Sequence, residues 1–120
     1  MKSDIKHVIV GYKLNKGGTK MYKYNIYIGM FDKDTKKQEL SNTEFLNTVR
    51  KVMRYNFIDN YTIIKAKGHY KSDTITVCEP SIIVEVIINY ELFTDDIKSM
   101  LCKELNQESI LITKQDIQVL

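Results

Sequence analysis

Apolar and polar residues alternate strictly between Tyr22 and Gly29, which predicts a strand with one buried face. Three more stretches have the composition of strands, at 61–70, 75–88 and 110–120. Within the third strand, 82–88 is apolar at every position except Glu85, and this predicts a central strand covered on both faces. We expect Glu79-Pro80-Ser81 to interrupt this strand, because proline has no N–H to donate. Gly68 predicts a bulge or a close approach of the backbone.

Two other segments carry apolar residues at helical spacing. The first follows Ser41, which has the capping-box spacing with Glu44, and it should end near residues 55–57. The second follows Thr94, the expected N-cap, and Gln107-Glu108-Ser109 should end it. Both helices have one apolar side, so we expect each to pack against the sheet.

The resulting order is β-α-β-β-α-β from Met21 onward. This order predicts an α+β fold, the ferredoxin-like sandwich, in which both helices cover one face of an antiparallel sheet. An additional N-terminal strand and turn, or hairpin, is predicted for residues 1–20, with residues 21–120 as the βαββαβ core. A chain of 120 residues has the usual length of one domain, so residues 1–120 are expected to form a single domain.

The composition narrows the class of protein. Apolar residues make up 43% and charged residues 28% of the chain, as in an ordinary globular protein. No apolar run reaches the roughly 18 residues of a membrane helix, and no signal peptide is recognised, so we expect a cytoplasmic protein without membrane contact. Cys78, Cys102, His7 and His69 lack the spacing of metal ligands, so we expect neither metal nor cofactor. Frequent Ile, Lys, Asn and Tyr indicate an A+T-rich genome, such as that of a bacterium, a phage or a mobile element.

Two short polar clusters carry the candidate chemistry. Glu79-Pro80-Ser81 precedes the most apolar strand, and Gln107-Glu108-Ser109 joins the last helix to the last strand. In a βαββαβ fold both clusters can lie near one edge of the sheet, where they would form a small-molecule site. Glu79 or Glu108 would serve there as an acid or base if burial raised the pKa of its carboxyl. The alternative is ordinary turn chemistry, for which Ser, Pro and polar residues are typical.

Glu85 is the one charge in an apolar strand. A buried carboxylate is costly unless it is paired or faces water, so we expect Glu85 on the sheet face opposite the helices. If two chains stack sheet on sheet, Glu85 can pair with a lysine of the second chain. This interpretation predicts a homodimer, and the alternative is a functional acid in a cleft.

Four motifs occur together in one order. They are Tyr27-Ile28-Gly29, Gly68-His69-Tyr70, Glu79-Pro80-Ser81 before an apolar strand, and Gln107-Glu108-Ser109-Ile110-Leu111. In this the chain resembles a family of small bacterial proteins of unknown function, over roughly residues 21–112. The resemblance supports the fold and implies candidate ligand-binding residues, which are Tyr27, His69, Glu79, Ser81, Gln107, Glu108 and Ser109. It implies no reaction, and Tyr70 replaces a more usual tryptophan.

Three functions remain open on the sequence. The first is a non-catalytic domain that binds a small molecule or a protein, encoded by a phage or mobile element. The second is a small acid/base enzyme that uses Glu79 or Glu108. The third is a binder of single-stranded nucleic acid, since residues 1–23 hold six lysines against Asp4; the net charge of +3 makes this the weakest of the three.

Overall fold

The computed structural model describes residues 19–120. The additional N-terminal strand and most of the basic hairpin predicted for residues 1–20 therefore lie outside the described residues, and so does His7. The elements follow in the order β1 (Thr19–Gly29), α2 (Asn42–Tyr55), β2 (Thr62–Ser72), β3 (Ile75–Ile88), α3 (Thr94–Leu105) and β4 (Leu111–Val119).

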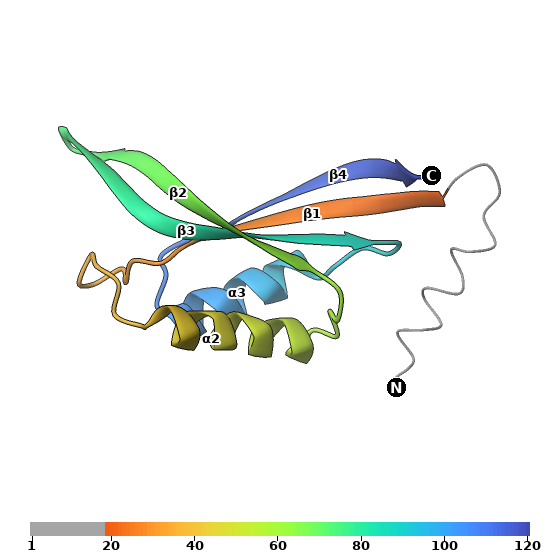
Figure 1. Cartoon of the computed structure of the whole chain (residues 1–120), viewed down its shortest axis with the longest axis horizontal. Coiled ribbons are helices and arrows are strands. Elements are labelled where there is room, and N and C mark those ends of the chain that lie inside the picture. Colours follow the sequence, from red (N-terminus) through yellow and green to blue (C-terminus); the bar gives the residue numbers. More distant parts are fainter. Residues whose placement is uncertain (1–18) are drawn as a thin grey trace.

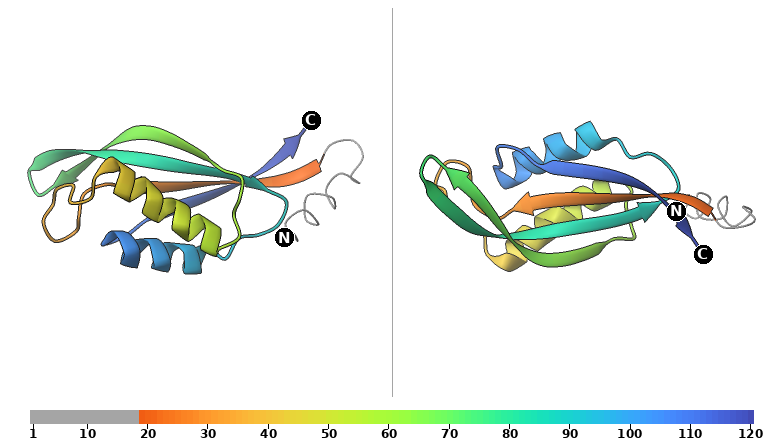
Figure 2. Two further views of the ribbon diagram at one scale, coloured as in Figure 1. Left: turned by 60° about the horizontal axis from the view of Figure 1, so that its bottom comes forward. Right: turned by 90° about the horizontal axis from the view of Figure 1, so that it is seen from above.

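The four strands form one antiparallel sheet in the order β2-β3-β1-β4. Both helices lie on the same face of this sheet (Figure 1), and a view from below shows them side by side (Figure 2). The predicted ferredoxin-like α+β architecture is thereby confirmed for residues 19–120. Among these residues, neither helix is long and apolar enough to cross a membrane.

The core forms where the buried side chains of β1 and β3 pack against the apolar sides of the two helices. The even-numbered residues of β1 and β3 face the helices, and the odd-numbered residues face away from them. The largest fully buried side chains come from the two strands, the two helices and the loop after α2; they are Tyr24, Ile26, Ile28, Phe45, Val49, Val52, Met53, Ile58, Val84, Val86, Ile97 and Leu101. Among residues 19–120, neither helix covers the opposite face of the sheet, and we call it the open face.

The helix starts agree with the sequence at α2 and differ at α3. Ser41 accepts a hydrogen bond from the Glu44 N–H, and the Glu44 carboxylate accepts one from the Ser41 N–H, so the predicted capping box is present. At α3 the N-cap is Phe93, no side chain caps the helix, and Thr94 is the first helical residue. The predicted N-cap at Thr94 is therefore wrong by one position.

Pro80 does not interrupt β3, contrary to our prediction. The strand runs without a break from Ile75 to Ile88, and its register with β2 is continuous through Gly68, so the alternative of a bulge there is also wrong. The Pro80 carbonyl accepts a hydrogen bond from Met30 N at 2.9 Å, on the side of β1. Because N and O of one strand residue point the same way, the Pro80 nitrogen also faces the side of β1. The paired ladder of β1 and β3 has already ended there at Gly29 and Ser81, and proline is tolerated at such a position.

The β2–β3 hairpin extends well past the end of β1. The pairing of β1 with β3 ends at Gly29 and Ser81, whereas β2 and β3 remain paired as far as Ser72 and Ile75. Figure 1 shows this extension at the left, above the loop that follows β1. The extension, the loop and the start of β4 thus meet at one end of the sheet.

Candidate functional site

A cavity of about 510 Å³ lies at this end of the sheet, and we call it the sheet-end cavity. Three segments that are distant in the sequence line it: the loop after β1, the β2–β3 extension and the turn between α3 and β4. The lining residues are Phe31, Asp32, Lys33, Lys36, Tyr70, Ser72, Val77, Glu79, Gln107, Glu108 and Ser109. Its volume is within the roughly 300–1,000 Å³ that is usual for small-molecule sites.

Glu79 is held in place by the backbone of the loop after β1. One oxygen of its carboxylate, Oε2, accepts a hydrogen bond from Phe31 N at 3.0 Å. The carboxylate crosses over Gly29, where an added Cβ would lie 2.6 to 2.8 Å from its atoms. Because such contacts are closer than real Cβ atoms allow, the close approach of Glu79 depends on glycine at position 29.

Gln107 binds the backbone carbonyl of the same residue, Phe31. Its Nε2 donates to the Phe31 carbonyl at 2.7 Å, and only 9% of the residue is exposed. The preceding residue, Asn106, adopts the left-handed conformation (φ 50°) at the C-cap of α3, as Asn often does at helix ends. This turn of the chain directs Gln107 back toward the loop, so Phe31 is bound by both polar clusters.

Asp32 stabilises the loop that forms the floor of the cavity. Asn106 Nδ2 donates to Asp32 Oδ1 at 2.8 Å, and the N–H groups of Asp34 and Thr35 donate to Oδ2 at 2.9 and 3.2 Å. The hydrogen bond from the Asn106 amide, followed by that from Asp34, lowers the pKa of the Asp32 carboxyl below its ordinary value. Asp32 is therefore a structural carboxylate that is already supplied with donors.

The cavity carries charges of both signs and an aromatic ring. Glu79 and Glu108 provide two carboxylates, Lys33 and Lys36 provide two ammonium groups, and Tyr70 provides the ring. Such a set suits an organic molecule that bears positive and negative groups and a flat part. Among residues 19–120, no three His, Cys, Asp or Glu side chains are placed to hold a metal ion.

The structure brings together four of the seven predicted ligand-binding residues. Glu79, Gln107, Glu108 and Ser109 all line the cavity, although they come from two different parts of the chain. Tyr27, His69 and Ser81 do not line it. His69 pairs with Cys78, next to the pair of Gly68 and Glu79, so His69 projects from the opposite face of the extension. Tyr27 and Ser81 lie further along the sheet, opposite Ile83 and Gly29 respectively.

Several lining residues escaped the sequence reasoning. Phe31, Asp32, Lys33 and Lys36 belong to the loop after β1, for which we predicted no function from the sequence. Tyr70, Ser72 and Val77 line the cavity because the hairpin turn sets them on the same face as Glu79. Every second residue of a strand lies on the same face, so counting in steps of two from Glu79 along the hairpin would have identified Tyr70, Ser72 and Val77.

Glu85 lies on the open face of the sheet, as predicted, but the lysine that pairs with it belongs to the same chain. Its Oε2 lies 3.2 Å from Nζ of Lys23, one strand away in β1. The pair is half-buried, with 31% of the lysine side chain and 25% of the glutamate side chain exposed. The charge of Glu85 is thus balanced without a second chain.

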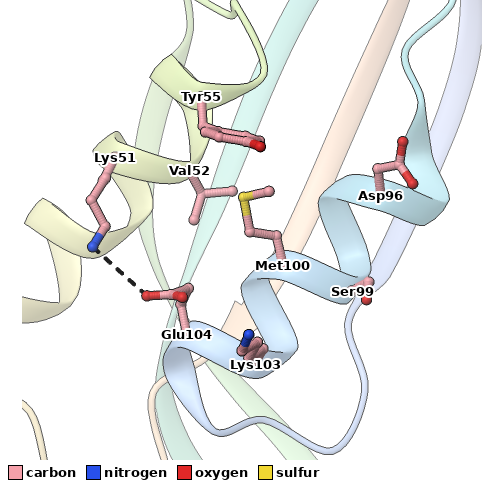
Figure 3. Close-up of a pocket in the computed structure, with 8 residues that line it drawn as sticks. All are labelled: Lys51, Val52, Tyr55, Asp96, Ser99, Met100, Lys103 and Glu104. Atoms are coloured by element: carbon pink, nitrogen blue, oxygen red, sulfur yellow. Dashed lines mark ion pairs between the residues drawn. The ribbon is translucent and has the colours of Figure 1, made fainter.

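A second cavity of about 480 Å³ separates the two helices (Figure 3). It lies between Tyr55 on α2 and Met100 on α3, and Lys51 and Glu104 form an ion pair across it at 3.8 Å. Asp96 and Lys103 also line this cavity, but neither of the two polar clusters predicted from the sequence does. We therefore regard the sheet-end cavity as the candidate site.

Among the solved structures that are similar to this chain are two of a phage SAM lyase. The first is a phage SAM lyase in complex with S-methyl-5'-thioadenosine, at 17% identity, with a TM-score of 0.58 over 82% of this chain and 88% of that chain. The second is a phage SAM lyase in the apo state, at 15% identity, with a TM-score of 0.60 over 85% of each chain. No family model and no curated protein matches this chain, so the resemblance to a bacterial family remains a prediction.

This finding corrects our first functional prediction. We expected a non-catalytic binding domain, whereas the solved proteins that share the fold are lyases, which are enzymes. The sequence offered no reaction motif, and for that reason the prediction favoured binding over catalysis.

Proposed function

We propose that this chain is a phage-encoded enzyme that cleaves S-adenosylmethionine at the sheet-end cavity and releases S-methyl-5'-thioadenosine. The observation that carries the proposal is the likeness in fold to a phage SAM lyase over most of both chains, one structure of which holds S-methyl-5'-thioadenosine. The cavity adds chemistry that suits this substrate.

The charges of the cavity are complementary to those of S-adenosylmethionine. The substrate carries a sulfonium and an ammonium group, which suit the carboxylates of Glu79 and Glu108. It also carries a carboxylate, which suits Lys33 or Lys36, and an adenine ring, which suits the face of Tyr70. Because Phe31 N–H fixes the Glu79 carboxylate, this charge is in place before the substrate arrives.

The product defines which bond breaks. S-methyl-5'-thioadenosine retains the sulfur, the methyl group and the adenosine, so cleavage falls between sulfur and Cγ of the amino-acid part. The bonding electron pair stays on sulfur, which changes from a sulfonium to a neutral thioether. If water does not take part, the four-carbon remainder has two routes. Either its own carboxylate oxygen bonds to Cγ and forms a ring, or a base removes a proton from Cβ and a Cβ–Cγ double bond forms. Identification of this product distinguishes the two routes.

The direct test is incubation of the purified full-length chain with S-adenosylmethionine. We expect S-methyl-5'-thioadenosine to appear with time, together with one equivalent of a four-carbon product whose mass shows no added water. The reaction run in ¹⁸O-labelled water should leave the product unlabelled when it is quenched early. Intact S-adenosylmethionine after long incubation would contradict the proposal.

We also propose that the chain forms the homodimer predicted from its sequence, through the open face of the sheet. One row of the open face crosses all four strands through Ile64, Ile83, Tyr27 and Leu111, which pair in that order. Three of the four are large exposed residues, with 43% of Ile64, 38% of Tyr27 and 60% of Leu111 accessible. An uncovered apolar row of this kind favours contact with a second copy of the chain.

Leu111→Glu should therefore shift the protein from a dimer toward a monomer in light-scattering chromatography, because a charge would enter the apolar row. Ile75→Glu is the control, since Ile75 is 66% exposed but lies at the tip of the hairpin. A wild-type protein that is monomeric at all concentrations, or a dimer unchanged by Leu111→Glu, would remove the open face as an interface.

A further inference from the structure

A third cavity, of about 490 Å³, lies between β2 and α2 on the helix side of the sheet, and we call it the basic cleft. Most of its lining is apolar and the rest is polar or cationic; the residues are Met30, Asn42, Leu46, Arg50, Ile63, Lys65, Ala66, Lys67, Cys78, Pro80, Ser81 and Ile82. An apolar floor with a few polar groups at the rim is the usual form of a small-molecule site.

The charges around the basic cleft all have one sign. Arg50 extends from α2, and Lys65 and Lys67 project from β2, while no Asp or Glu lines the cleft. The guanidinium of Arg50 donates to the neutral Asn47 Oδ1 at 3.0 Å. Neither lysine takes part in an ion pair with any residue in 19–120. Three cations thus surround an apolar cavity without a compensating anion from the described part of the chain.

Protection of an exposed strand edge explains only part of this arrangement. Strand β2 is at the edge of the sheet, and lysines on an edge discourage pairing with another sheet. That role accounts for Lys65 and Lys67 on the strand. It does not account for the apolar cavity beneath them or for Arg50 on the facing helix.

We propose that the basic cleft binds a small organic anion with an apolar body, its acid group held by Arg50, Lys65 and Lys67. This site is distinct from the sheet-end cavity, because Cys78 and Pro80 line the cleft while Glu79, between them, lines the sheet-end cavity. Successive residues of a strand project to opposite faces, so the two sites share one strand as a wall. The proposal does not depend on turnover of S-adenosylmethionine.

Equilibrium binding of the dye anilinonaphthalene sulfonate to the folded full-length chain tests the proposal. The matched neutral probe is N-phenylnaphthylamine, which has the same rings without the sulfonate. We expect the anionic dye to bind more tightly than the neutral probe. Decanoate or decyl phosphate should displace it and decanol should not, and which of the two anions is stronger tells a carboxylate ligand from a phosphate ligand.

Charge-neutral variants locate the binding. Arg50→Gln/Lys65→Gln/Lys67→Gln should weaken binding of the anionic dye about tenfold or more, since each lost charge removes a favourable contact. The control Lys71→Gln/Lys98→Gln/Lys103→Gln lowers the net charge by the same amount with residues outside the cleft. Thermal melting of both variants confirms that each is folded.

Cys78 gives an independent readout because it is exposed and lines the cleft. In a Cys102→Ala background, the bound dye should slow alkylation of Cys78 by iodoacetamide, which is neutral. Equal affinity in the two triple variants, tighter binding of the neutral probe, or unchanged alkylation of Cys78 would each overturn the proposal. These outcomes are unaffected by whether the chain cleaves S-adenosylmethionine.

Discussion

Replacing Glu79 with glutamine should lower kcat/KM for S-adenosylmethionine about a hundredfold. The glutamine oxygen can still accept the hydrogen bond from Phe31 N–H, so the loop after β1 keeps its anchor. What is lost is the negative charge that, in the proposed function, faces the sulfonium or ammonium group. Removal of one partner from a close charge pair costs about 2–5 kcal/mol, which covers the expected loss. The measurement is the initial rate of S-methyl-5'-thioadenosine release.

A matched control separates the effect of losing the Glu79 charge from the effect of losing a carboxylate elsewhere in the protein. Glu104→Gln removes a carboxylate on α3 that lies outside the sheet-end cavity and pairs with Lys51. This variant should retain wild-type kcat/KM. If Glu79→Gln retains full activity at an unchanged melting temperature, Glu79 does not contact the substrate. If both variants lose activity together, the effect is not specific to the cavity.

Gly29→Ala should reduce activity at least tenfold while the melting temperature changes by only a few degrees. The new Cβ would lie within 2.8 Å of the Glu79 carboxylate, which is the far end of a flexible side chain and can swing away. Its movement gives up the hydrogen bond to Phe31 N–H, worth about 0.5–1.5 kcal/mol of stability. The site therefore loses its fixed charge although the strand remains folded.

Gly68→Ala is the control for Gly29→Ala, because the nearest atoms to its new Cβ are 3.9 Å away in ordinary contact. It should leave both activity and stability close to wild type. The double variant Gly29→Ala/Glu79→Gln should be no less active than Glu79→Gln alone, since both changes act on one carboxylate. Additive losses would show that Gly29 supports activity by a route that does not involve Glu79.

The fold was predictable because its signals are local and periodic. Alternation in β1, the capping box at Ser41 and the apolar side of each helix depend on neighbours in the sequence. The order of the elements then leaves few ways to assemble a sheet. The errors arose where one residue type has two outcomes: Pro80 is tolerated because β1 has ended beside it, and that condition is set by another strand.

The candidate site was predictable only in part, for a related reason. Glu79 and Gln107 stood out as polar residues beside apolar strands, and the topology brings their clusters together. Lys33, Lys36 and Tyr70 join them through the course of a loop and the reach of a hairpin, which no short sequence pattern encodes. His69 was misplaced because a one-residue step along a strand reverses the face from which a side chain projects.

The two backbone hydrogen bonds of Phe31 have a consequence for spectroscopy. Its N–H is bound by a side chain 48 residues away in the sequence and its carbonyl by one 76 residues away. In an amide NMR spectrum, the Phe31 resonance therefore reports at once on the hairpin and on the turn after α3. Its exchange with deuterium should be slow while the side chain at position 79 accepts its hydrogen bond, so one proton serves as a marker for the assembled site in each variant.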